Sequence, residues 1–395
     1  MLHTGDNHLD PPSRQFLSKD MARRKDFLES FGNVVTYALE NKPELFLLTG
    51  DLFDTINPRN PARKYVMSLL RQLNEAGIKV LAISGTHDTP KSEIEGVSPI
   101  ALYEIPQYLH FLKESVAIKP EDFKLGNISV KVCGISHNPN LSEESDPLKD
   151  LKFPDPADVN LFLFHGNIQG LQGASTSDRA VKLESVPEYV DYVAGGHIHT
   201  HTEYNRENSK EENSTLFTYC GSTEYVSMGE DINTPKGFYW LEFDKHGLIQ
   251  EGAEFIPLKT RQIKQAEFHL ANDVQDLTKV IIDFIKKDSN PDAIYQISFA
   301  GEISTDNFIK IRQDSILRAG LNHFFHFIPD YSQVTRDPGR IHLEGESVKP
   351  VEAFSDYLTK EITQNQGIEG EAEKVAYLKQ VKTTGLDRLR KFGAT

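Results

Sequence analysis

The sequence contains, at residues 45–54, the run Leu45-Phe46-Leu47-Leu48-Thr49-Gly50-Asp51-Leu52-Phe53-Asp54. It begins as a short, unbroken apolar segment and then reaches Gly and Asp, which is typical of a strand buried on both faces of a sheet. Two further runs of this kind lie at residues 80–83 and 161–164. Apolar residues at helical spacing occur at residues 27–39 and 68–73. The first part of the chain is therefore predicted to be a layered α/β domain.

The pattern of apolar residues changes twice further along the chain. From Asn127, helices become rare and strands follow one another. After Pro257 the alternation restarts, with strands expected at 262–270, 293–300 and 323–329 and helices at 274–285 and 307–319. Pro, Gly and Asp then accumulate, which is typical of a linker. We therefore expect a first domain, a small α/β domain, a linker and a helical tail, over residues 1–258, 259–330, 331–349 and 350–395.

The expected tail carries two apolar stripes at helical spacing. They consist of Val351, Phe354, Leu358 and Ile362, and of Val375, Leu378, Val381, Leu389 and Phe392. An exposed stripe on a helix typically marks a groove for a partner or a missing neighbour. We therefore expect the tail to bind a partner. In the alternative, both helices fold back on the small domain.

Length and composition exclude several classes of protein. A chain of 395 residues is long enough for two domains and an appendage. No segment approaches the roughly 18 consecutive apolar residues of a membrane span, and the first residues do not resemble a secretory signal. Cys133 and Cys220 lie singly in apolar runs, so neither a disulfide framework nor a cysteine zinc site is expected. We expect a cytoplasmic protein.

Five short motifs place His or Asp at the end of an apolar run. They are Asp6-Asn7-His8, Gly50-Asp51-Leu52-Phe53-Asp54, Gly85-Thr86-His87-Asp88, His165-Gly166-Asn167 and Gly195-Gly196-His197-Ile198-His199. Ligands of open α/β sheets bind beyond the carboxyl ends of the strands, so five such ends can converge on one site. Each motif alone is weak, because patterns this short are common in turns and caps. Together, and in this order, they predict a functional site.

The residue types in these motifs indicate a pair of metal ions. Two cations about 3.5 to 4 Å apart can clamp both oxygens of an in-line displacement at phosphorus and lower the pKa of a bridging water. A carboxylate between the ions must bridge them, and this suits Asp51. Imidazole and carboxylate ligands together favour Mn²⁺, Fe²⁺ or Zn²⁺ over Mg²⁺.

These motifs resemble those of the calcineurin-like metallophosphoesterases, and within them the SbcD-type (Mre family) nucleases of DNA double-strand-break repair. Two further stretches carry the narrower resemblance, namely Arg23-Arg24-Lys25-Asp26-Phe27, and Tyr219-Cys220-Gly221-Ser222-Thr223-Glu224 followed by Lys236-Gly237-Phe238. The match is good over residues 1–258, fainter in the small domain and only architectural in the tail. The resemblance implies an α/β/β/α metallophosphoesterase sandwich, a small α/β capping domain that faces DNA, and a helical tail that binds an ATPase.

The resemblance also implies roles for individual residues. One ion would be held by Asp6, His8, Asp51 and His199, and the other by Asp51, His165, His197 and the side chain of Thr86. His87 would be the general acid that protonates the departing sugar oxygen, with Asp88 orienting its ring and raising its pKa.

Two positions depart from the family pattern. The family usually has Asn at position 86, whose amide oxygen binds metal, whereas this sequence has Thr86. The Thr86 hydroxyl must reach the ion or leave a water in its place, which weakens the second ion. Position 54 is often His in archaeal relatives and is Asp54 here. A second histidine for the transition state is therefore missing or supplied elsewhere.

Other basic residues and histidines have simpler interpretations. Arg14, Arg23 and Arg24 lie near the first motif and are candidates for contacts with DNA phosphates; in the alternative they form a solvated helix start. His201, two residues past His199, is expected behind the ligands or at the surface. We expect structural roles for the histidines outside the motifs, such as His3.

The expected function is a Mn²⁺-dependent DNA nuclease of a break-repair complex, an exonuclease with endonuclease activity, located on the nucleoid if the source is prokaryotic. Its net charge of −15 opposes DNA binding. By resemblance, an SbcC-type coiled-coil ATPase would bind the tail and supply DNA affinity, and the protein would form homodimers. One alternative is a phosphoesterase acting on small substrates or phosphoproteins. The other is a docking subunit for the ATPase with weak catalysis, which Thr86 keeps open.

Overall fold

The computed structural model describes residues 1–12, 16, 19–142, 145–171, 180–208, 214–337, 350–365 and 372–391. Contacts between Cα atoms divide the chain into two compact units. The first comprises Met1–Leu270, Val274–Gly301 and Ile311–Val334. The second comprises Ala271–Asp273, Glu302–Lys310 and Thr335–Thr395.

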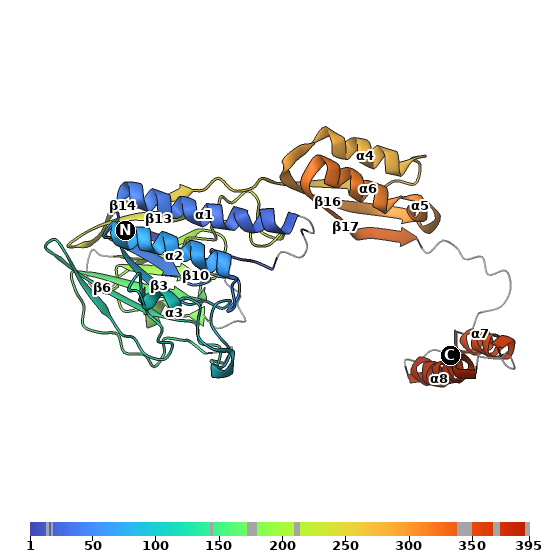
Figure 1. The fold of residues 1–395 in the computed structure, drawn as a ribbon, viewed down its shortest axis with the longest axis horizontal. Coiled ribbons are helices and arrows are strands. Elements are labelled where there is room, and N and C mark those ends of the chain that lie inside the picture. Colours follow the sequence, from blue (N-terminus) through green and yellow to red (C-terminus); the bar gives the residue numbers. More distant parts are fainter. Residues whose placement is uncertain are drawn as a thin grey trace. The chain divides into compact units, whose positions relative to one another are not determined.

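The first sheet of the larger unit has six strands in the order β14-β13-β1-β2-β3-β4 (Figure 1). They span Gly247–Pro257, Gly237–Asp244, Leu2–Thr4, Leu45–Thr49, Lys79–Ile83 and His110–Phe111. Strands β1 to β4 are parallel, and β13 and β14 run antiparallel at one edge. Helices α1 (Asp20–Asn41) and α2 (Asn60–Glu75) pack side by side over this sheet, and the short helix α3 spans Ala101–Glu104.

The second sheet also has six strands, in the order β11-β12-β10-β7-β6-β5. They span Thr202–Glu207, Ser214–Tyr219, Tyr192–Gly196, Val159–His165, Ile128–Ile135 and Glu121–Leu125. The four central strands are parallel. Leu148, Leu171, Val186 and Val190 cover the outer face of this sheet, from loops that include the 3-10 turn η3 (Leu183–Ser185) and the strand pair β8 (Asn167–Ile168) and β9 (Ala180–Val181).

Strand β2 shows why residues 45–48 form an unbroken apolar run. Leu45 and Leu47 point into the core between the two sheets, whereas Phe46 and Leu48 point into the core beneath the helices. All four side chains are buried. A strand covered on both faces has no position that favours a polar residue. The predicted layered α/β sandwich is confirmed.

The small α/β domain has a three-stranded sheet in the order β15-β16-β17, with strands at Ile263–His269, Asn290–Ser304 and Phe324–Asp337. Helices α4, α5 and α6 span Leu277–Lys287, Thr305–Lys310 and Gln313–His323. The prediction of one helix over 307–319 was wrong, because α5 and α6 are separate. Strand β17 also continues through Pro329 into the expected linker. It is an edge strand, where the missing proline N–H is tolerated.

The tail forms two helices, α7 (Pro350–Asn365) and α8 (Ala372–Lys391), which pack against each other. Leu358, Ile362 and Val375 are buried between them, and a Cβ added at Gly385 would meet the ring of Phe354. The expectation of an exposed stripe was therefore wrong, because the stripe of α7 is largely used against α8. Phe392 lies outside the described residues.

A buried polar network joins the two sheets below the strand ends. His3 of β1 places its Nδ1 2.7 Å from the Tyr192 hydroxyl of β10 and its Nε2 3.1 Å from the Thr49 hydroxyl of β2. Burial lowers the pKa of His3 to about 3, so its ring is neutral. The predicted structural role of His3 is confirmed.

No helix of the described residues is long and apolar enough to cross a membrane.

Candidate metal centre

The five predicted motifs lie directly after strands β1, β2, β3 and β10, or at the end of β7. In three of the five motifs the backbone is strained, because Asp6, His8, Asp51 and His197 all have positive φ, at 47°, 44°, 48° and 99°. Residues other than glycine rarely adopt a positive φ, and strained backbone of this kind clusters at functional sites. The turns thus point their side chains away from regular strand directions and toward one another.

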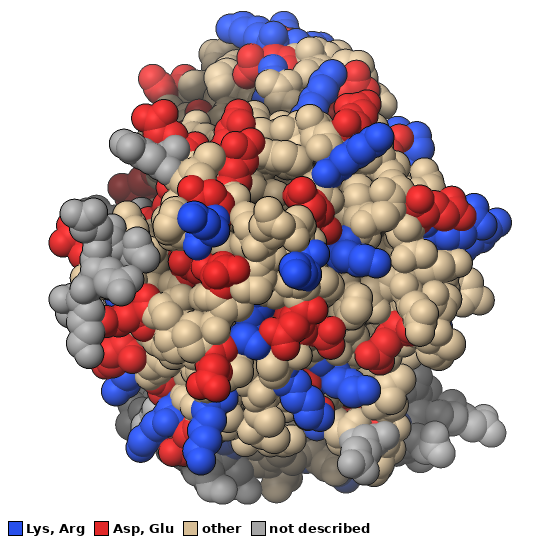
Figure 2. Space-filling view, turned by 90° about the vertical axis from the view of Figure 1, so that its left-hand side faces the viewer, with Lys and Arg blue, Asp and Glu red and all other residues tan. Residues whose placement is uncertain are grey.

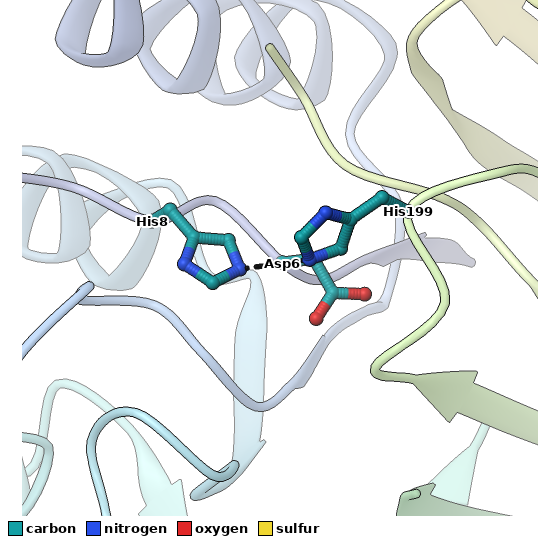
Figure 3. Close-up of side chains that lie close together, drawn as sticks. All are labelled: Asp6, His8 and His199. Carbon is teal, nitrogen blue, oxygen red and sulfur yellow. Dashed lines mark hydrogen bonds between the residues drawn. The ribbon is translucent and has the colours of Figure 1, made fainter. Parts of the chain in front are cut away.

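Asp6, His8 and His199 form the first group, in which the ligand atoms lie within 4.8 Å of one another. Figure 3 shows the two imidazoles facing each other with the Asp6 carboxylate beside them. The Nε2 atoms of His8 and His199 are 3.1 Å apart. Asp51 lies at the edge of this group, with its Oδ2 3.8 Å from His8 Nε2.

The second group consists of Asp6, Asp51 and His165, again within 4.8 Å. His165 Nδ1 donates to the Thr49 carbonyl at 2.8 Å. Its Nε2 is buried without a hydrogen bond and faces Asp51 Oδ2 at 3.2 Å. The Thr86 hydroxyl donates to Asp51 Oδ2 at 3.1 Å. Thr86 is thus held against the Asp51 carboxylate.

His197 lies beside the second group. Its ring centroid is 5.4 Å from that of His165, and the two residues line a cavity of about 220 Å³ together with Thr86. The His197 backbone N–H donates to the Asp6 carboxylate at 2.9 Å. The preceding Gly196 has no room for a side chain, because an added Cβ would overlap the Thr49 carbonyl that holds His165.

The buried carboxylates of Asp6 and Asp51 require compensating positive charge nearby. Burial raises the pKa of Asp6. Burial also opposes ionisation of Asp51, but the charges of His165 and His8 outweigh it and hold its pKa below the usual range. Burial disfavours a charged His165, yet Asp51 and Asp6 raise its pKa to about 10. Protons or metal ions can supply this positive charge.

His87 lies at the open side of the centre, and its partner corrects the sequence prediction. Its Nδ1 is 3.3 Å from the carbonyl and 3.6 Å from Oδ1 of Asp54, whose Oδ1 also lies 2.7 Å from His8 Nδ1. The Asp88 carboxylate instead accepts from the N–H groups of Gly85 and Phe53, at 2.7 and 3.4 Å. Asp54, not Asp88, is therefore the carboxylate beside the His87 ring. Burial and the nearby Asp51 raise the pKa of Asp88 to about 7.

The arginines predicted to contact DNA are mostly committed elsewhere. Arg23 is 1% exposed and pairs with Asp26 and Glu224, at 3.2 and 3.3 Å. The prediction for Arg23 was wrong, because its guanidinium is buried inside the fold. Arg24 pairs with Asp20 at 3.0 Å and stays partly accessible. Arg14 lies outside the described residues.

The donor set fits divalent metal ions. Each group combines imidazole nitrogens with carboxylate oxygens, which suits Mn²⁺, Fe²⁺ or Zn²⁺. The buried Nε2 of His165 has a lone pair or proton and no hydrogen-bond partner, which is costly unless a further group binds it. Asp6 belongs to both groups, which the sequence assigned to one ion only.

A sequence model of the calcineurin-like phosphoesterases matches residues 1–201, which carry all five motifs. The chain belongs to the calcineurin-like phosphoesterase family. Its metal-binding chemistry therefore rests on the fold, the clustered side chains and family membership together. The predicted superfamily is confirmed.

Archaeal proteins named DNA double-strand break repair protein Mre11 are similar to this phosphoesterase. The one from Sulfurisphaera tokodaii is 32% identical over 205 residues, which cover 51% of this chain and 49% of that protein. Those from Methanocaldococcus jannaschii and Saccharolobus solfataricus are 28% and 27% identical, over 66% and 76% of this chain and 67% and 75% of their own. The chain thus spans only about half of the Sulfurisphaera relative. The narrower resemblance to the break-repair group is confirmed.

Sequence reasoning missed two acidic residues of the site. Asp54 was noted only as a departure from the family, although it lies three residues after Asp51 and shares its turn. Glu230 was not considered, although its Oε1 is 3.1 Å from His199 Nδ1. It lies in a loop 31 residues after His199, and no spacing rule connects the two positions. His201, left open by the sequence, stacks on Phe255 at 4.1 Å.

Proposed function

We propose that this phosphoesterase is a Mn²⁺-dependent DNA nuclease of double-strand-break repair, an exonuclease with endonuclease activity that acts in the cytoplasm. The two groups of His and Asp share Asp6 and both lie close to Asp51, which supports a two-ion phosphodiesterase. The relatives named for DNA double-strand break repair support the substrate.

The chain's own residues divide the chemical work. Asp6, His8, Asp51 and His199 would hold one ion, and Asp51, His165, His197 and Thr86 the other. When bound, such ions polarise a phosphoryl oxygen and lower the pKa of a bound water. His87 is nearly half exposed at the mouth of the centre, where its ring can give a proton to a departing sugar oxygen. Asp54 orients that ring, and Asp88 ties the turn before it to Phe53.

The surface charge bears on how DNA is bound. Lys and Arg alternate with Asp and Glu on the face shown in Figure 2, and no continuous basic stripe crosses that face. Together with the net charge of −15, this favours a partner that supplies basic surface for DNA. We take that partner to be an SbcC-type coiled-coil ATPase.

The central prediction separates metal binding from proton transfer. His87→Ala should lower cleavage of an end-labelled duplex in Mn²⁺ by about 10²-fold or more, because it removes a general acid, while both ions stay bound. Asp51→Asn should lose cleavage and metal together. Cleavage should be much weaker in Mg²⁺, which prefers oxygen ligands. His110→Ala, at the surface on β4, is the control and should behave as the unchanged protein.

Three outcomes would count against this proposal. Loss of Mn²⁺ from His87→Ala would show that this residue is a ligand. Hydrolysis of bis-p-nitrophenyl phosphate without cleavage of DNA would favour the small-substrate phosphoesterase. Undiminished binding of the ATPase, with no detectable hydrolysis by the unchanged protein, would favour the docking subunit.

The tail is proposed to bind the ATPase through its outer surface. Because Leu358 and Ile362 are used against α8, the exposed side chains Tyr357 and Tyr377 remain for a partner. Deletion of residues 350–395 should abolish co-purification with the ATPase and spare Mn²⁺-dependent cleavage of short duplexes. The Tyr357→Lys/Tyr377→Lys protein should weaken binding without removing the helices. Unchanged affinity after the deletion would refute this assignment.

A second copy of the chain is proposed to cover an apolar patch near α3. Ile94, Val97 and Ile105 are 97%, 72% and 80% exposed within twelve residues of chain, more than single scattered apolar residues require. Sedimentation equilibrium should give a dimer, and Ile105→Lys should give a monomer. Met21→Lys changes an exposed apolar residue outside the patch and should leave the dimer intact. A monomeric unchanged protein would disprove the dimer.

A further inference from the structure

The segment after the last motif wraps around His199. Gly221 has φ of 74°, and a Cβ added there would lie 2.9 Å from the His199 carbonyl. The Ser222 N–H donates to the same carbonyl at 3.2 Å. The Lys236 ammonium donates to it at 2.8 Å. These contacts with the His199 carbonyl give a structural reason for two stretches of sequence, 219–224 and 236–238, which hold none of the proposed metal ligands.

Glu230 contacts the side chain of the same residue, His199. Its Oε1 lies 3.1 Å from His199 Nδ1, and its Oε2 forms an ion pair with Lys236. The same carboxylate accepts from the N–H groups of Val226 and Ser227, at 3.1 and 2.7 Å. Lys236 is buried, with its ammonium 4.9 Å from the centre of the Tyr225 ring. Glu230 is therefore fixed from several sides and has little freedom to leave His199.

The position of Glu230 determines which nitrogen of His199 is available to a metal ion. A neutral imidazole carries its proton on one nitrogen only, and the proton stays on the nitrogen that faces a hydrogen-bond acceptor. A carboxylate at Nδ1 keeps the proton there and leaves the Nε2 lone pair directed toward His8 and Asp6. Partners of this kind commonly orient metal-binding histidines.

Two other histidines of the centre, His8 and His165, follow the same arrangement with different partners. His8 Nδ1 lies 2.7 Å from Asp54 Oδ1, and His165 Nδ1 lies 2.8 Å from the Thr49 carbonyl. All three rings thus hold Nδ1 against an acceptor and present Nε2 to the centre. Glu230 is the acceptor for the His199 ring.

We propose that Glu230 is a positioning residue for the first metal ion and that Lys236 holds Glu230 in place. Glu230 acts through His199 and does not itself touch metal or DNA. The inference rests on the proposed metal centre and adds to it a determinant outside the five motifs. A purely structural ion pair between Glu230 and Lys236 would stabilise the loop and leave metal affinity unchanged.

The test is Mn²⁺ binding by calorimetry on the full-length chain. Glu230→Gln keeps the size of the side chain and removes its charge. We expect it to weaken one of two Mn²⁺ sites by roughly 10- to 100-fold, as loss of such partners does, with the other site unchanged. Cleavage should then need more Mn²⁺ and recover at saturation. Glu203→Gln is the matched control, because Glu203 accepts from the Tyr239 hydroxyl at 2.7 Å and lies outside the ligand set.

A second variant guards against misfolding. Glu230→Asp retains the charge that pairs with Lys236 but is one methylene shorter, so its carboxylate withdraws from His199, and it should show the same selective loss. Two sites of unchanged affinity in both variants would overturn the inference and leave the proposed function standing. Fewer than two Mn²⁺ sites in the unchanged protein would overturn the proposed metal centre itself.

Discussion

Two carboxylates, Asp6 and Asp51, are buried among imidazoles, and their burial determines how the two sheets must be arranged. Charges removed from water are costly unless opposite charge and hydrogen bonds surround them. Asp6 accepts from the backbone of His197, and Asp51 accepts from His87 N–H and Thr86. These contacts join turns from strands of both sheets, so the two sheets must stack with their carboxyl ends together. The apolar cores between and outside the sheets set that stacking.

Many polar groups near the centre support it without taking part in chemistry. Asp26 receives two hydrogen bonds from Arg261, at 2.6 and 2.7 Å, and pairs with the buried Arg23. Glu224 pairs with Arg23 as well. Arg23 thus ties α1 to Glu224 in the segment after β12, and Arg261 ties it to the segment just before β15. Because these residues serve the fold, we expect DNA to bind to other surfaces and to a partner.

The layered fold was predicted from local signals in the sequence, whereas the individual metal ligands were assigned by resemblance to a family. The sequence alone shows the apolar runs at 45–48 and 161–164. It also shows the His and Asp residues of the five motifs, because these residues directly follow the strand ends or lie at them. Partners that meet through tertiary packing could not be predicted. Asp54 and Glu230 reach His87 and His199 from other loops, Arg23 is buried by Tyr225 and Glu224, and the stripe of α7 meets α8 across residues 366–371. Helix ends near Ile311 and the edge strand through Pro329 also depended on context.

Anomalous diffraction at the manganese edge, from crystals grown with Mn²⁺, would show directly how many ions bind and which residues hold them. We expect two peaks, with Asp51 binding both ions. Asp6, His8 and His199 would surround one ion, and His165, His197 and Thr86 the other. A single peak, or two peaks that do not share Asp51, would refute the two-ion centre.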